Sequence, residues 1–77
     1  MKIEVLGTGC AKCNTLEQAV RKAAEKLQID CEIEHVTDLN RISSYGVMIT
    51  PALVIDGQVK VSGKLPGQRE LEDLLRQ

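Results

Sequence analysis

Residues 6–13, Leu6-Gly7-Thr8-Gly9-Cys10-Ala11-Lys12-Cys13, organise the rest of this chain. Two glycines make the backbone adaptable here, and two cysteines follow them, separated by two residues. An alternating apolar segment precedes the stretch and a helical pattern follows it. The sequence therefore predicts a turn that places two thiols at the start of a helix.

The flanking segments predict a strand-helix-strand unit. Residues 1–6 alternate apolar and charged side chains as a short strand does, and this alternation predicts that Glu4 does not point inward. From Cys13 to about Gln28, apolar side chains recur at helical spacing. Residues 29–36 alternate again and predict a second strand. Because a helix joins the two strands, we expect them to be parallel, with a right-handed crossover.

A short second helix is predicted next. Thr37 or Asp38 can cap its start, and Gly46 suits the left-handed backbone position just past its end. Residues 47–51 then form a connection into the third strand.

The last third of the chain predicts a hairpin and a helix. Asp56-Gly57 is a strong two-residue turn signal between strands at 52–55 and 58–62. Pro66 suits the first turn of a final helix with a leucine stripe. The expected fold class is α/β, with the order strand, helix, strand, helix, strand, strand, helix over residues 1–77 as a single domain.

Composition excludes several classes of function. The net charge of the 77 residues is −1 and Lys and Arg are interspersed with acids, so we expect no nucleic-acid partner. No apolar run approaches the roughly 20 residues that span a bilayer, so no direct membrane insertion is expected. Three cysteines are too few for a secreted disulfide framework. A cytoplasmic protein is the prediction.

A cysteine pair at this spacing can form a small disulfide, hold a soft metal or remain unreactive. In a cytoplasmic protein it is more often catalytic or metal-binding than structural. A disulfide across so small a loop contributes only about 2 kcal/mol to stability in the chain-entropy model. A bridge that opens and closes is therefore a better use of the pair than a static link.

Position along the helix distinguishes the two thiols. At the helix start, unpaired N–H groups and the positive end of the helix dipole favour the thiolate of Cys10, and Lys12 adds a nearby cation. Cys13 lies one turn further in, where this stabilisation is weaker. Cys10 is therefore the predicted nucleophile. Cys13 is predicted to resolve the mixed disulfide that Cys10 forms with a target.

The layout resembles the minimal thioredoxin/glutaredoxin fold, and Gly7-Thr8-Gly9-Cys10-x-x-Cys13 resembles the entry of small thioredoxin-like redox-active disulfide proteins. Thr50-Pro51 matches the cis-proline loop of that superfamily. The resemblance implies a four-stranded mixed sheet flanked by three helices, with the cis-proline loop packed opposite the cysteines. It also implies a thiol-disulfide oxidoreductase that acts on disulfide-containing proteins, accepts electrons from a donor like thioredoxin reductase, and needs no metal or organic cofactor.

A soft-metal carrier is the alternative function. Carriers with a ferredoxin-like fold also begin with a strand, a CxxC loop and a helix, and such thiolates suit Cu(I). However, Thr8 stands where those carriers usually place a methionine, residues 38–46 look helical rather than extended, and the sequence ends on a helical pattern. These features favour the oxidoreductase.

Four further residues have side chains that could take part in a site. Cys31 and His35 could add zinc ligands, but four residues of a strand span about 13 Å, which bonds of about 2.0–2.3 Å cannot bridge. Cys31 is therefore predicted to be a small buried residue, and His35 is given no role. Met48 and Ile49 either rim an apolar surface that receives a partner protein or cover the core.

Overall fold

The chain alternates strands and helices in the predicted order. The structure is a computed structural model that describes residues 1–8 and 11–76. Its elements are β1 (Lys2–Leu6), α1 (Ala11–Lys26), β2 (Glu32–Val36), α2 (Leu39–Ser44), β3 (Ala52–Ile55), β4 (Gln58–Ser62) and α3 (Gln68–Leu75).

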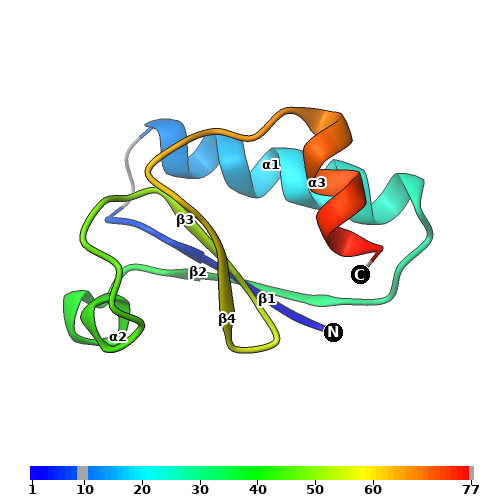
Figure 1. Ribbon diagram of the computed structural model, residues 1–77. Helices are drawn as coiled ribbons and strands as arrows, with labels where there is room; N and C mark the ends of the chain where they lie inside the picture. Colours follow the sequence, from blue (N-terminus) through cyan, green and yellow to red (C-terminus); the bar gives the residue numbers. More distant parts are fainter. Residues whose placement is uncertain (9–10, 77) are drawn as a thin grey trace.

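The four strands form one mixed sheet in the order β2-β1-β3-β4 (Figure 1). β1 pairs with β2 in parallel and with β3 in antiparallel fashion, and β4 pairs antiparallel with β3. The parallel pair is the one that α1 connects, as the sequence predicts. This is the four-stranded, three-helix arrangement of a minimal thioredoxin fold.

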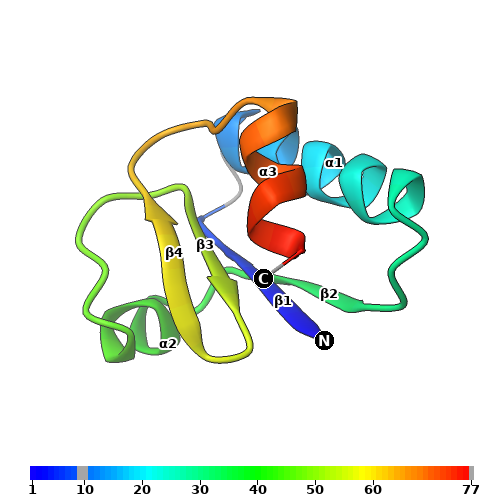
Figure 2. The same cartoon turned by 45° about the vertical axis from the view of Figure 1, so that its right-hand side comes forward.

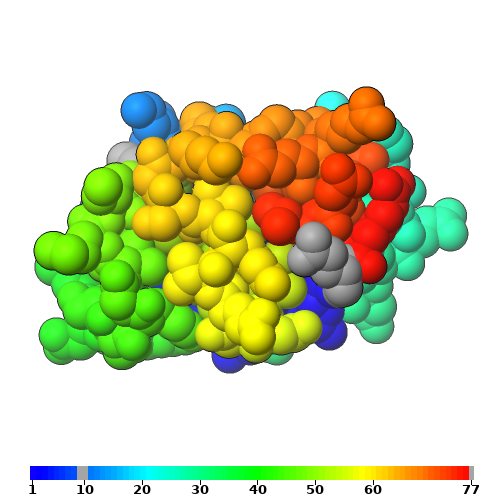
Figure 3. All heavy atoms as spheres, in the orientation of Figure 1, coloured from blue at the N-terminus to red at the C-terminus, as the bar shows by residue number. Residues whose placement is uncertain are grey.

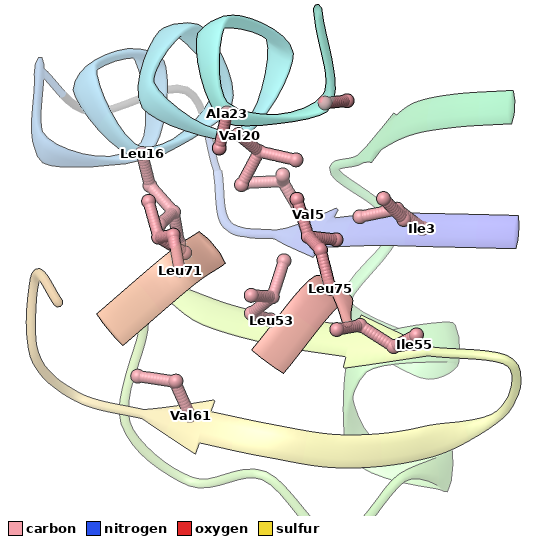
Figure 4. Close-up of a cluster of buried hydrophobic side chains, with 11 residues drawn as sticks. Ile3, Val5, Leu16, Val20, Ala23, Leu53, Ile55, Val61, Leu71 and Leu75 are labelled. Atoms are coloured by element: carbon pink, nitrogen blue, oxygen red, sulfur yellow. The ribbon is translucent and has the colours of Figure 1, made fainter. Parts of the chain in front are cut away.

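The helices cover both faces of the sheet. α1 and α3 lie side by side on one face, and α2 lies on the other (Figures 1 and 2). Figure 4 shows the main core, in which side chains of α1 and α3 point toward those of β1, β3 and β4. A second cluster fills the α2 side of the sheet and includes Leu6, Val36 and Ile42.

Burial of Glu4 corrects the sequence interpretation. Its side chain points away from Ile3 and Val5, as the alternation requires, but α2 covers that face and leaves Glu4 only 3% exposed. Tyr45 donates its hydroxyl hydrogen bond to Glu4 Oε1 at 2.6 Å, and Arg41 donates to Glu4 Oε2 at 2.9 Å. A buried carboxylate with these donors is a satisfied group that ties α2 to the centre of the sheet.

Arg41 extends this contact to the edge strand. Its guanidinium also donates to Glu34 of β2 at 2.9 Å, so one side chain joins carboxylates of two neighbouring strands. The hydrogen bond from Arg41 holds the pKa of the Glu34 carboxyl below its ordinary value. The network fixes the end of α2 against β1 and β2.

Local signals place the second helix and the hairpin correctly. Of the two candidate caps, Asp38 is the one used, and its carboxylate accepts from the backbone N–H of Asn40 at 2.9 Å. Gly46 follows the helix with φ +76°. Asp56 and Gly57 have φ of 49° and 83°, as a tight hairpin turn requires.

Three predicted boundaries differ from those observed. α1 begins at Ala11, directly after Cys10 as predicted, but it ends at Lys26 rather than at about Gln28, whose backbone turns to φ 56°. The second strand begins at Glu32, so Cys31 precedes it. Gly67 is the N-cap of α3, which places Pro66 before the helix rather than in its first turn. Each error lies at an element end, where turn residues and tertiary contacts decide the boundary.

No helix among the described residues is long and apolar enough to cross a membrane. Figure 3 shows one face of the molecule, where β4 (yellow) and the segment leading to α3 (orange) lie at the surface. The region of α2 and the loop after it (green) forms the left end of this view.

Candidate functional site

Cys13 lies in the first turn of α1 and is completely buried. Helical spacing places it on the side of the helix that faces the sheet, with Leu16 and Val20. Cys10, the predicted nucleophile, lies outside the described residues. In the sequence it immediately precedes Ala11, the first residue of α1.

Gly7 lies directly against Cys13. A Cβ atom at Gly7 would overlap Cys13 Sγ, and it would come within 3.1 Å of Cys13 Cβ and 3.9 Å of Thr50 Cβ. The backbone N–H of Gly7 donates to the carbonyl of Val36 at 2.9 Å, which continues the β1–β2 pairing one residue past the strand. Gly7 is therefore the point where α1, the end of β1 and the Thr50 loop meet.

The Thr50-Pro51 peptide bond is cis, as the family resemblance implies. Pro51 is buried and Thr50 is exposed. Two hydrogen bonds from the end of β4 hold this loop: Ser62 Oγ donates to the carbonyl of Ile49 at 3.1 Å, and the N–H of Gly63 donates to the carbonyl of Pro51 at 2.8 Å. The cysteine helix and the proline loop thus meet at the same edge of the sheet.

Sequence reasoning missed Ser62 and Gly63 as supports of this loop. In the sequence, Gly63 only marks the end of the strand predicted at 58–62. It has φ +77°, and a Cβ there would come within 2.8 Å of the Ile49 side chain. A glycine directly after a predicted edge strand was the available signal, but only the structure shows which loop packs against it.

A groove of about 450 Å³ opens beside the loop. Seven residues line it: Thr8, Leu39, Ile42, Ser43, Val47, Met48 and Thr50. Its rim is apolar and accessible, because Met48 is 95% exposed, and Ile49 in the adjoining loop is 64% exposed. Of the two interpretations of Met48, coverage of the core is wrong, and its exposure fits the other.

The remaining candidates lie elsewhere. Lys12 is exposed on the first turn of α1. Cys31 is half-buried and packs against the main core. It is thus less buried than the sequence predicts. His35 pairs with Glu17 of α1. Within residues 1–8 and 11–76, no three His, Cys, Asp or Glu side chains gather in a way that could hold a metal ion.

Comparison with known proteins identifies the family. A family model described as a thioredoxin domain matches residues 1–76. The chain belongs to the thioredoxin domain family. A thioredoxin of Methanothermobacter thermautotrophicus is 37% identical over 75 residues, which cover 97% of both chains. A thioredoxin of Methanocaldococcus jannaschii is 42% identical over 74 residues, 96% of this chain and 85% of the relative.

Family membership confirms the general activity expected from the sequence, thiol-disulfide oxidoreduction. It also agrees with the fold, whose β3–β4 hairpin is followed by α3. A ferredoxin-like metal carrier would need two strands after α1 and a final strand. The described chain has α2 and α3 in those places, so the fold on which the copper alternative depended is not the one observed.

Proposed function

We propose that the chain reduces or exchanges disulfides in partner proteins through a reversible disulfide between Cys10 and Cys13. The observation that carries this proposal is the position of Cys13, buried in the first turn of α1 against Gly7, which also lies beside Thr50 of the cis-proline loop. A buried thiol can react with a substrate only after another group has formed a covalent bond to that substrate. This order fits a nucleophilic cysteine that attacks first and a resolving cysteine that attacks second.

In the first step the Cys10 thiolate attacks one sulfur of the target disulfide and releases the other as a thiolate. Cys10 immediately precedes α1 in the sequence, and the N-terminus of a helix stabilises an anion. The exposed ammonium of Lys12 adds a cation on the same turn. Both features favour the ionised nucleophile at neutral pH.

In the second step the Cys13 thiolate attacks Cys10 in the mixed disulfide. The bond between Cys10 and the target breaks, the target leaves reduced, and the Cys10–Cys13 bridge forms. Two electrons pass from the pair to the substrate. A protein donor similar to thioredoxin reductase then reopens the bridge, and no further cofactor takes part.

The cis-proline loop supplies the substrate side of the site. Thr50 is exposed beside the buried Pro51, so its backbone can pair with an extended substrate segment, as strand addition requires. The apolar groove that includes Leu39 and Met48 lies next to this backbone and can receive an apolar side chain of the substrate. Disulfide-containing proteins are the proposed substrates, and a cytoplasmic location remains a prediction.

An insulin-reduction assay tests the proposal. Cys10→Ser is expected to reduce insulin no faster than the reductant alone, because the serine hydroxyl does not attack disulfides. Cys31→Ser is the matched control and should keep the wild-type rate, because Cys31 packs against the core away from the cis-proline loop. Circular dichroism establishes that both variants fold. Equal rates for Cys10→Ser and the wild type would contradict the proposal.

A further inference from the structure

We infer that the Glu17–His35 pair accepts the proton of Cys13 during the resolving step. The inference rests on the proposed function and adds a proton acceptor to it. A buried thiol must ionise before it can attack the mixed disulfide. Because Cys13 is completely buried, bulk water has poor access to its proton.

His35 and Glu17 form a partly buried pair between β2 and α1. His35 Nδ1 donates to Glu17 Oε1 at 3.0 Å, and the two side chains are 20% and 18% exposed. Arg21 donates from Nε to the other oxygen of Glu17 at 3.2 Å. The carboxylate therefore fixes the orientation of the imidazole, and Arg21 in turn fixes the carboxylate.

The second nitrogen of the imidazole is available. His35 Nε2 is buried and has no hydrogen-bond partner among the described residues. When the imidazole is neutral, its N–H proton lies on Nδ1, which donates to Glu17. Nε2 then carries the lone pair. Nε2 can therefore accept a proton. During the resolving step, we assign the thiol proton of Cys13 to this nitrogen.

Backbone placement brings this acceptor to the same corner of the fold as Cys13. Glu17 lies one helical turn after Cys13, a spacing that puts their Cβ atoms about 5–6 Å apart. Cys13 Sγ lies over Gly7, and Gly7 donates to the carbonyl of Val36, the residue after His35. The proposed transfer takes the proton from Sγ to Nε2, either directly or over one bridging water.

Other charged groups on this face come from α1 and α3. α1 contributes Glu17, Arg21 and the exposed Lys12, and α3 contributes the buried Glu72, which pairs with Lys26 near the far end of α1. β1 places the apolar Val5 beside His35. The carboxylates of Glu4 and Glu34 lie on the opposite face of the sheet, bound by Arg41.

In this step Cys13 loses its proton and then displaces the target. The S–H proton of Cys13 moves to His35 Nε2, and the resulting imidazolium is stabilised by Glu17. The Cys13 thiolate forms a bond to the sulfur of Cys10, and the target sulfur leaves with the electron pair of the broken bond. The imidazolium then returns its proton to the departing thiolate or to solvent. Glu17 positions the ring, and His35 moves the proton.

A two-phase thiol reaction separates this step from the first attack. One equivalent of 5,5′-dithiobis(2-nitrobenzoate) reacts with the reduced protein, and release of the coloured thiolate is followed by stopped flow. The first release reports attack by Cys10 and depends on reagent concentration, whereas the second reports displacement by Cys13 and does not. All proteins carry Cys31→Ser so that no third thiol contributes.

His35→Gln is expected to slow the second phase at pH 7 by about 100-fold or more, since a positioned base typically contributes 10²–10⁴-fold. The rate of the first phase should be unchanged. The difference between the second-phase rates of His35→Gln and the reference protein should become smaller toward pH 9, because hydroxide then takes the thiol proton in place of the imidazole. Glu17→Gln should show the same pattern to a smaller degree. Glu25→Gln, an exposed carboxylate on the same helix, is the control and should match the reference protein.

Each outcome has a separate meaning. A second phase that is equally fast in His35→Gln and the reference across this pH range overturns the inference and leaves the proposed function intact. If His35→Gln does not fold, Glu17→Gln decides by the same criterion. A reference protein that shows no concentration-independent second phase contradicts the proposed function itself.

Discussion

Gly7→Ala is expected to lower the free energy of unfolding by about 1–3 kcal/mol and to impair the release of substrate by Cys13. The new methyl group would overlap Cys13 Sγ, which is buried and has little free space into which to move. Either the sulfur rotates away from its position or the backbone of Gly7 shifts. A shift would also disturb the N–H bond from Gly7 to the carbonyl of Val36.

Urea denaturation and the two-phase thiol reaction measure these two effects. Gly67→Ala is the control, because a Cβ at Gly67 meets nothing within 4 Å and its backbone lies at φ −69°, which alanine adopts freely. We expect the control to remain within about 1 kcal/mol of the wild type, the usual cost of alanine at an N-cap. A Gly7→Ala protein with wild-type stability and an unchanged second phase would contradict the close approach of Cys13.

Tyr45→Phe is expected to lower the free energy of unfolding by about 1–3 kcal/mol, the cost of leaving a buried acceptor unpaired. The hydroxyl of Tyr45 donates to Glu4 Oε1 at 2.6 Å, and the variant removes that donor while keeping the ring. Glu4 would remain buried with Arg41 alone. Lys64→Gln, which breaks an exposed ion pair with Glu70, is the control and should remain near wild type.

The dependence on pH distinguishes this hydrogen bond from simple loss of packing. The hydrogen bond to Glu4, followed by burial, raises the pKa of Tyr45 above its ordinary value of 10.0. Because the folded pKa is above the unfolded one, the contribution is complete below pH 10 and is lost as the pH rises through the folded pKa. The stability gap between wild type and Tyr45→Phe should therefore be constant near neutral pH and shrink in the alkaline range. A gap that does not change would show that the hydroxyl does not hold Glu4.

The order of elements could be predicted because each one carries its own local signal. The turn signal Asp56-Gly57 predicts both hairpin strands with their correct ends, and the helical spacing after Cys13 predicts α1. The cis bond at Thr50-Pro51 could be predicted only through the family resemblance, since no local pattern separates a cis from a trans proline.

What could not be predicted depends on contacts between distant segments. Glu4 alternates away from the main core as expected, but the sequence does not show that α2 covers that side of the sheet. His35 looked like an ordinary strand residue because its partner, Glu17, lies on another element. The same holds for Ser62, whose bond to the carbonyl of Ile49 joins segments that only the fold brings together.

Disulfide mapping shows whether Cys10 and Cys13 form a reversible bridge. Trypsin cleaves after Lys12, between the two cysteines, so a bridge would join peptide 3–12 to peptide 13–21. After mild oxidation, alkylation and digestion, mass spectrometry should find these two peptides linked and separable by reduction, with alkylated Cys31 in peptide 27–41. Two separately alkylated peptides, or a bridge that contains Cys31, would rule out the proposed Cys10–Cys13 bridge.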